Sequence, residues 1–596
     1  MTAKRWFAML VGTVLLIAAL ICAFNVAADP FGVFGDVFFG WYSFDMTENP
    51  RAAKYKWLEM NNEKYDAYVL GASGASSLSP ETLGRYTGLR WYNAFNYGSD
   101  MEYTARLARH IIENYRVEQL VLCLPVSNGA KYSVPAGDIT YLPHPELVGG
   151  AASYARFLFA NPGYARDKLI KYASDGYLQA AHDVFDVSTG AYDKSLRDAE
   201  PIGDLAGYLA RYPEFTAGNE YRPAVELTRI GECMGAIREI SELCERRSIE
   251  LTVIVPPMLN AELSRYAEPQ VAEFFSELAD ITDFWDFAAT PVSADPRYFY
   301  DETHFRNAVG EMMLARVFGD TSVYAPPGFG ELVTTGGAPS AAARLVAGGS
   351  AEPADYTREL TVYLYHNIVD TAGGEEMPPN STPLSSFEDD MLALAADGYT
   401  SVGISELTDY VERGTELPEK PVLVTFDDGY MSNYELAFPV LKRMDIKAVI
   451  FAIGVSVGRD TYKDTGKPMT PHFGEAEIRE MTASGLVSVQ SHSYDMHQAE
   501  GYDSAPRPGV LRLAGESEDG YIALLRADFT RSRAELEAAS GGSVAAFAYP
   551  YGFSDKLSEV LLRQLGVKAT FSIEPGINVL VKGLPQSLYN LKRFAR

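Results

Sequence analysis

The chain has 596 residues, of which 47% are hydrophobic and 22% charged, so we expect folded protein rather than extensive disorder. The formal net charge of −28 would repel a phosphate backbone, which argues against nucleic acid as a partner. The length predicts two or three domains.

The four cysteines predict free thiols rather than a disulfide framework. Cys233 and Cys244 lie about three helical turns apart in a helical pattern, too far for a bridge within one helix. Cys22 falls in an apolar run and Cys123 in a predicted strand. The spacing of the four matches no cysteine-type metal site.

An uncharged apolar run, residues 6–28, opens the chain and is long enough to cross a bilayer core of about 30 Å. Lys4 and Arg5 precede it, which places the N-terminus in the cytoplasm. We expect a single-pass transmembrane signal anchor in the cell membrane, with the catalytic domains on the extracytoplasmic side. The alternative is a cleaved signal peptide, because residues 26–28 offer small side chains for cleavage.

An aromatic and glycine-rich connector, residues 30–44, precedes the first predicted domain, residues 52–320. Strands and helices alternate in this domain, which predicts a parallel sheet with helices on both faces. The strands are expected at residues 65–71, 90–95, 118–124, 249–256 and 283–287, and a tyrosine-rich, largely helical stretch is expected at about 150–246.

Residues 325–357 are dominated by proline, glycine, alanine and serine without periodicity, which predicts a flexible linker. The second domain, residues 358–596, again alternates strands and helices. The number of strand–helix steps fits a (β/α) barrel with fewer than eight strands.

Several metal-binding and acid–base residues follow strand ends in the second domain. Asp427 and Asp428 end an apolar strand in PVLVTFDDGY, and His492 and His497 follow another strand in VSVQSHSYDMHQ. Asp428 with the two histidines forms a three-ligand set that leaves a coordination position open, as in catalytic zinc sites. The alternative is that these residues have no catalytic role and form an Asp-Gly turn and two surface histidines in a polar loop.

The motifs TFDDG, SHSYDMH and YPYG, in this order, resemble the polysaccharide deacetylases of carbohydrate esterase family 4, the NodB-homology fold. The resemblance covers about residues 360–596 and implies a distorted (β/α) barrel and a divalent metal, usually zinc. It makes Asp427 the general base and Asp428, His492 and His497 the metal ligands. The backbone N–H of Tyr551 would donate a hydrogen bond to the oxyanion that forms during the reaction.

The sequence departs from that family pattern in two places. The arginine usual before the Pro-Tyr loop is absent, and no histidine follows His497 to act as general acid. First and last strands of a barrel are neighbours, so we infer a circularly permuted barrel in which His366, in YLYHN, is the acid. The biofilm poly-N-acetylglucosamine deacetylases resemble this arrangement. The alternative is that His366 is a core histidine and His472, in TPHF, is the acid.

The first domain carries a weaker signature. Ser73 follows a strand in YVLGASG, and Asp301 and His304 lie three apart in YDETHF. This order resembles the SGNH/GDSL hydrolases, in particular the SGNH-like domains of cell-surface polymer acylation proteins. The resemblance implies a three-layer α/β/α fold, with Ser73 as nucleophile, His304 as its base and Asp301 as the orienting carboxylate. Gly98 is a candidate oxyanion donor, and Asn128 stands in for a missing glycine–asparagine pair.

These expectations predict a membrane-anchored, extracytoplasmic N-deacetylase acting on an N-acetylated cell-surface or cell-wall polysaccharide, with a companion O-acyl esterase or transferase domain. Export or wall-assembly proteins are expected partners. Alternatives are a peptidoglycan deacetylase, a protein whose main function is O-acyl transfer, and a catalytically silent, glycan-binding scaffold of an export assembly.

Overall fold

The computed structural model describes residues 2–41, 47–130, 137–173, 184–215, 223–337, 356–370, 377–504 and 506–596. The chain divides into two compact units. The N-terminal unit comprises residues 1–194, 212–321 and 325–354, and the second unit comprises residues 195–211, 322–324 and 355–596. The second unit therefore includes a short segment, residues 195–211, from the first half of the chain.

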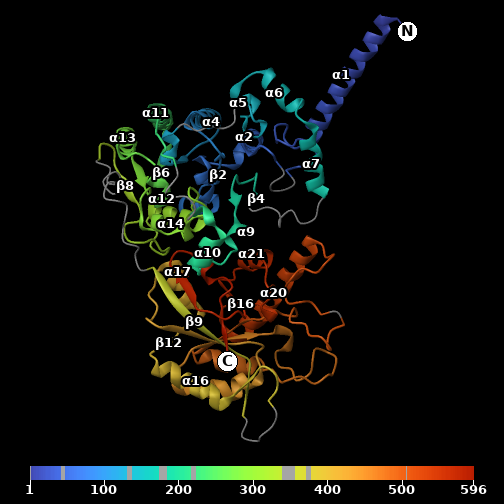
Figure 1. Cartoon of the computed structure of the whole chain (residues 1–596), viewed down its shortest axis with the longest axis vertical. Helices are drawn as coiled ribbons and strands as arrows, with labels where there is room; N and C mark the ends of the chain where they lie inside the picture. The colour runs from blue at the N-terminus through green and yellow to red at the C-terminus, as the bar shows by residue number, and fades with distance from the viewer. Residues whose placement is uncertain are drawn as a thin grey trace. The chain divides into compact units, whose positions relative to one another are not determined.

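The apolar run forms one helix, α1 (Ala3–Ala28), whose apolar window has a mean hydropathy of 2.7 and is not buried in protein. Figure 1 shows α1 extending away from the other helices of its unit, with α6 and α7 at its C-terminal end. A helix of this length and composition fits either a signal sequence or a membrane anchor. The four cysteines are free, as expected.

The sheet of the N-terminal unit has the order β2-β1-β3-β6-β7-β8. The first five strands are parallel and coincide with the five predicted ones, while β8 pairs with β7 in the antiparallel sense. All residues of β1 are buried, as expected for a sheet covered on both faces. The strands are β1 (Ala67–Gly71), β2 (Trp91–Asn93), β3 (Gln119–Cys123), β6 (Glu250–Val255), β7 (Phe284–Asp286) and β8 (Glu331–Val333). A separate hairpin-like pair consists of β4 (Val184–Phe185) and β5 (Tyr192–Asp193).

Helices supply the remainder of this unit, and side chains of α2, α4, α11 and α13 join those of the strands in one large apolar core. The helices are α2 (Pro50–Asn61), α3 (Pro80–Thr87), α4 (Met101–Asn114), α5 (Pro145–Val148), α6 (Ala151–Leu158), α7 (Pro162–Ala173), α11 (Ile230–Arg247), α12 (Asn260–Leu263), α13 (Glu268–Ala279) and α14 (Asn307–Phe318).

Two predicted boundaries of this unit are wrong. The connector after α1 is folded, because Phe31 and Val33 are buried against Phe157, and Lys168 forms an ion pair with Asp36 at 2.6 Å. The predicted linker starts too early, because β8 lies within its range and is hydrogen-bonded to the sheet. Its alanine- and serine-rich part, residues 338–355, lies outside the described residues.

The second unit contains a curved sheet of the order β17-β16-β15-β14-β13-β9-β18, in which β9 to β17 are parallel neighbours. Its strands are β9 (Thr357–Tyr365), β12 (Thr400–Ser401), β13 (Pro421–Phe426), β14 (Ala448–Ala452), β15 (Val487–Ser491), β16 (Ala546–Ala548), β17 (Ala569–Phe571), β18 (Asn578–Val581) and β19 (Phe594–Ala595). A short parallel pair consists of β10 (Asn367–Val369) and β11 (Ser381–Pro383).

Residues 591–595 join the two sides of this sheet. Leu591 bridges Phe571 of β17, and β19 pairs in parallel with β9. The first and last parts of the domain are therefore neighbours, and the circular permutation stays a prediction. The helices of this unit are α9 (Ser195–Asp198), α10 (Leu205–Arg211), α16 (Leu384–Ala396), α17 (Ile404–Arg413), α18 (Phe438–Met444), α19 (Glu475–Ala483), α20 (Glu518–Ser540) and α21 (Lys556–Gln564).

Alternate strand residues of the second unit face two different apolar cores. Val422, Val424 and Phe426 of β13 pack with the helices, whereas Leu423 packs in a second cluster with residues of β9, β14, β16 and β17. Both faces of the strands are thus buried, and the polar chemistry is confined to their carboxyl ends.

Candidate active sites

The predicted metal ligands lie at the carboxyl ends of two strands that flank β14. Asp427 and Asp428 follow β13, and His492 follows β15. Asp428 has a φ of +72°, a left-handed conformation that aspartate tolerates better than most residues, and Gly429 continues it at +84°. This turn directs the two adjacent carboxylates differently.

The three predicted ligands come together. One donor atom from each of Asp428, His492 and His497 lies within 4.8 Å of the other two. Asp428 Oδ1 is 3.7 Å from His492 Nε2 and 3.5 Å from His497 Nε2. Asp428 and His492 are buried, and His497 is partly exposed, so the cluster faces solvent on one side.

Several details of this cluster fit a divalent metal. Asp428 Oδ1 is buried and accepts no hydrogen bond from any residue that the structure describes, an arrangement that costs free energy unless something else occupies it. His492 Nδ1 lies 2.8 Å from the carbonyl oxygen of Ala548, which leaves Nε2 as the unprotonated nitrogen facing Asp428. Two imidazoles and one carboxylate form a donor set suited to zinc and similar ions.

The electrostatics of the cluster agree with this donor set. Burial lowers the pKa of His492 to about 4, so the imidazole is neutral at pH 7, as a metal ligand must be. Burial alone would raise the pKa of Asp428, but the neighbouring His497 and His492 outweigh it, and the net pKa is lowered.

Asp427 is paired with Arg593, a residue that the sequence analysis did not single out. Both side chains are buried, and Arg593 donates from Nη1 and Nη2 to the two carboxylate oxygens at 2.7 and 2.8 Å. A third hydrogen bond runs from Arg593 Nε to the carbonyl of Ser572 at 2.7 Å. Burial would raise the pKa of Asp427, but Arg593 and then His492 hold it below its usual range. The sequence has no arginine directly before the Pro-Tyr loop, and the arginine that pairs with Asp427 lies near the end of the sequence.

Two histidines lie near the adjacent residues Asp427 and Asp428. His366 directly follows β9, whose Tyr365 is in register with Phe426, the residue before Asp427. His366 is among the groups that lower the pKa of both aspartates. His472 is 7% exposed, and its ring centroid lies 4.9 Å from that of Tyr430. Burial lowers the pKa of His472, while nearby Asp428 opposes that shift. Both histidines therefore remain candidates for the general acid, and His366 is the more exposed of the two.

The Pro-Tyr loop also reaches the cluster. Tyr551 lies in a tight turn after β16 with a φ of +59°. Its ring centroid is 4.3 Å from that of His497, and its hydroxyl donates to the carbonyl of Gln498 at 2.7 Å. The loop is thus positioned beside the candidate metal site, and the oxyanion role of the Tyr551 N–H stays a prediction.

Comparison with known proteins assigns this half of the chain. Residues 414–570 match the polysaccharide deacetylase family. These residues belong to a polysaccharide deacetylase domain. Such domains are carbon–nitrogen hydrolases, and the matched range contains both aspartates and the two histidines of the cluster. His366 and Arg593 lie outside it, so their placement rests on the geometry of this chain alone.

Individual relatives extend the match. The protein YxkH of Bacillus subtilis (strain 168) is 34% identical over 143 residues, which are 24% of this chain and 45% of that protein. The poly-beta-1,6-N-acetyl-D-glucosamine N-deacetylase of Escherichia coli (strain K12) is 27% identical over 233 residues, or 36% of this chain and 34% of that protein. The chain thus spans less than half the length of both relatives. A solved de-N-acetylase structure from Aggregatibacter actinomycetemcomitans aligns with 40% of this chain and 94% of its own at 25% identity and a TM-score of 0.34.

Outside the deacetylase domain, the N-terminal unit brings its three predicted catalytic residues together. His304 Nε2 lies 2.7 Å from Ser73 Oγ, and His304 Nδ1 lies 2.8 Å from both carboxylate oxygens of Asp301. Burial opposes ionisation of Asp301, but hydrogen bonds from His304 and from backbone N–H groups lower its pKa overall. The residues predicted as nucleophile, base and orienting carboxylate are therefore in hydrogen-bond contact.

The backbone before Ser73 requires a glycine. Gly71 ends β1 with a φ of +144°, and a Cβ atom there would lie 2.5 Å from the carbonyl oxygen of Cys123 on β3. Ser73 then opens a short 3₁₀ turn, residues 73–77. The turn places Ser73 at the carboxyl end of the parallel sheet, where α/β enzymes hold their ligands.

The serine site opens into a cavity of about 260 Å³. Ser73 and His304 line it together with Gly98, the candidate oxyanion donor, and Asn128, the stand-in for the glycine–asparagine pair. The structure therefore places all four around one space, and their catalytic roles remain predictions.

Proposed function

We propose that the protein is a metal-dependent polysaccharide N-deacetylase that removes N-acetyl groups from a cell-surface or cell-wall glycan containing N-acetylglucosamine. The observation that carries this proposal is the cluster of Asp428, His492 and His497, with its buried unpaired carboxylate oxygen, within a polysaccharide deacetylase domain. The E. coli relative, named for poly-beta-1,6-N-acetyl-D-glucosamine, supports this substrate class.

The residues around the cluster divide the chemistry between them. A divalent metal, zinc by preference, would polarise the amide carbonyl and acidify the attacking water. Asp427 takes a proton from this water, and Arg593 keeps its carboxylate ionised and oriented. His366 protonates the departing amide nitrogen, so that acetate and a free amine result. The Tyr551 N–H donates to the oxyanion.

We further propose that α1 stays attached as a membrane anchor, with both units outside the cytoplasm. Asn25, near the end of α1, is 1% exposed and donates to the carbonyls of Leu158 and Ala160 at 3.0 and 2.9 Å. Asp29 accepts three backbone N–H bonds from residues 33, 34 and 36, each at 2.9 Å. Cleavage after Ala28 would remove part of this buried structure. N-terminal sequencing of protein recovered from membranes should therefore find α1 intact.

Acetate release tests the deacetylase. The full chain, purified in detergent with its metal, should release acetate from β-1,6-linked N-acetylglucosamine oligomers, and Asp427→Asn should not. Acetate release from peptidoglycan instead of these oligomers would identify the protein as a peptidoglycan deacetylase. No acetate release, together with no bound metal, would favour a catalytically silent, glycan-binding scaffold.

The choice between the two candidate acids has its own test. His366→Ala should keep the metal and lose about 10²- to 10⁴-fold in turnover, with His472→Ala as the matched comparison. The reverse result would assign the acid to His472.

A second candidate function is O-acyl ester hydrolysis or transfer by the N-terminal unit, favoured by the assembled contacts of Ser73, His304 and Asp301. Ser73 Oγ attacks the ester carbonyl while His304 takes its proton. The acyl–oxygen bond of the sugar ester breaks, and the alcohol leaves with that proton. Water then releases the acid from Ser73, or a second hydroxyl accepts the acyl group.

Labelling with a fluorophosphonate tests this second function. The wild-type protein should be labelled and Ser73→Ala should not, while Ser99→Ala, which changes another serine of the same cavity, should retain labelling. Absence of labelling in folded wild-type protein would refute catalysis by this unit.

A further inference from the structure

The cavity that holds Ser73 adjoins a larger groove on the same unit. The groove has a volume of about 590 Å³, within the range of ligand sites. Asp100 and Asn128 line both the groove and the Ser73 cavity. Asp100 caps the N-terminus of α4, and Asn128 lies in the turn after β3. The groove and the serine cavity therefore adjoin at these two residues.

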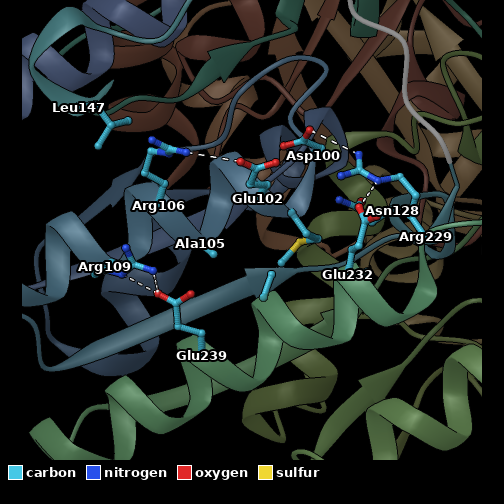
Figure 2. A pocket seen from close by; sticks show the side chains of 13 residues that line it. Asp100, Glu102, Ala105, Arg106, Arg109, Asn128, Leu147, Arg229, Glu232 and Glu239 are labelled. Carbon is cyan, nitrogen blue, oxygen red and sulfur yellow. Dashed lines mark hydrogen bonds and ion pairs between the residues drawn. The ribbon is translucent and has the colours of Figure 1, made fainter. Parts of the chain in front are cut away.

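Two packed helices form the walls of this groove, which we name the α4–α11 groove. Figure 2 shows the side chains of α4 and α11 facing each other across it. The lining positions recur at spacings of three, four and seven residues, so each helix presents one face. They are Glu102, Ala105, Arg106 and Arg109 of α4, and Glu232, Cys233, Ala236 and Glu239 of α11.

Paired charges border the groove along its length. Arg109 Nε lies 2.6 Å from Glu239 Oε1, which links the two helices, and Arg106 Nη2 lies 3.4 Å from Glu102 Oε1. At the end nearest Ser73, Arg229 pairs with Asp100 at 3.7 Å and with Glu232. Each pair presents donors beside acceptors, and the small side chains of Ala105 and Ala236 lie among them.

This composition selects among ligand classes. Three arginines and four carboxylates leave a formal charge of −1 in the groove, and the chain as a whole carries −28, so a polyanion would be repelled. Neighbouring donors and acceptors suit the hydroxyls of a sugar ring, while small apolar side chains suit its C–H faces. An uncharged glycan satisfies both conditions.

We propose that the α4–α11 groove binds an uncharged, hydroxyl-rich glycan segment and presents its O-acyl group to Ser73. The inference deepens the second candidate function and rests on it for the chemistry, although binding in the groove does not require an active serine. The 260 Å³ serine cavity then receives the ester group, and the groove holds the adjoining sugars.

A pair of substrates separates the groove from the serine site. p-Nitrophenyl acetate needs only the Ser73 cavity, whereas an O-acetylated N-acetylglucosamine hexamer also needs the groove. In the double variant Arg109→Ala/Glu239→Ala, kcat/KM for the hexamer relative to the small ester should fall at least about five-fold. Arg246 and Glu242 form a matched exposed pair on α11 outside the groove, 3.4 Å apart. Their double alanine variant should keep the wild-type ratio, and equal ratios in both double variants would overturn the proposal.

A binding measurement keeps the test independent of Ser73 chemistry. Gly235 lies on α11 next to the lining Ala236, takes part in none of the ion pairs, and has open space around the position of a Cβ. Gly235→Cys, made in the Ser73→Ala background and labelled with an environment-sensitive dye, should show a saturable emission change when the O-acetylated hexamer is added. The same dye at Glu242→Cys should not respond, and unsubstituted protein carried through the labelling supplies the blank. Absence of a response at position 235 overturns the groove even where Ser73 is active. Response at 235 without fluorophosphonate labelling of the wild type refutes the esterase and leaves a glycan-binding groove.

Discussion

Replacing Arg593 with methionine should both destabilise the second unit, which holds the deacetylase domain, and disable Asp427, the proposed general base. The guanidinium is 0% exposed and makes two hydrogen bonds to Asp427 and one to the Ser572 carbonyl. Arg593→Met would leave the Asp427 carboxylate buried without a counter-ion. Breaking a buried pair in this way costs about 3–5 kcal/mol, which is roughly a 10²- to 4 × 10³-fold increase in the opening equilibrium at about 1.4 kcal/mol per tenfold change.

The double variant Arg593→Met/Asp427→Asn supplies the control for this prediction. Removing both charges should recover at least half of the lost free energy, because replacement of a whole buried pair by neutral groups is often close to neutral. Both variants should lose activity, so the comparison of the single with the double variant measures the free energy of unfolding and not catalysis.

The assay must report on the deacetylase unit alone. All five tryptophans precede residue 356, so their fluorescence follows the N-terminal unit and serves as an internal control. Hydrogen exchange of peptides from β9 and β13, read by mass spectrometry, follows the deacetylase unit. Exchange in Arg593→Met within about five-fold of wild type, or a double variant no more stable than the single one, would refute this reasoning.

The remaining predictions concern the metal, pH and backbone geometry. Asp428→Asn should lower the metal content from one equivalent to below about 0.1 by elemental analysis, and a full equivalent in folded variant protein would contradict the assigned ligand set. Burial raises the pKa of Asp528 to about 6, so this carboxyl binds its proton more tightly in the folded unit. Its contribution to the free energy of unfolding should therefore fall by up to about 3 kcal/mol between pH 4 and pH 6, and Asp528→Asn should remove that slope from exchange measurements on metal-free protein. Gly71→Ala should abolish fluorophosphonate labelling of Ser73, because the added methyl group meets a β3 carbonyl. Gly88→Ala, at a φ of +75° with open space around its Cβ, should cost about 1 kcal/mol and keep labelling; equal effects of the two would contradict the steric argument.

Strand patterns and local motifs made much of the fold predictable. The five parallel strands of the N-terminal unit fall where the sequence predicted them, because buried strands have a strong local signal. The candidate metal cluster was predictable for the same reason: Asp428 and His492 follow such strands directly, and carboxyl ends of parallel strands meet at one edge. The placement of His366 at the end of β9, next to β13, followed from expecting the first and last strands to be neighbours.

Long-range pairing was the part that the sequence did not reveal. Arg593 lies in no motif, and it meets Asp427 across 166 residues only because the final segment joins the two sides of the sheet. The missing arginine before the Pro-Tyr loop was the one available hint. The composition around β8 predicted a linker, because this stretch is rich in Gly and Thr. The segment instead forms a strand that pairs with the edge strand β7. Such a strand is stabilised by its pairing and not by its side-chain pattern.

The segment 195–211 has a practical consequence for dividing this protein. Leu196 and Ala199 form an apolar cluster with Val560 of α21, and the Cα of Gly203 faces the backbone of Val579 so closely that a side chain would meet its carbonyl oxygen at 2.9 Å. A recombinant fragment begun near residue 356 would lack these residues and leave Val560 open to solvent. Conversely, a fragment that ends near residue 356 would keep residues 195–211 but lose Val560, against which Leu196 and Ala199 pack. Expression of either half alone calls for grafting or deleting residues 195–211, since no single cut separates the two folding units cleanly.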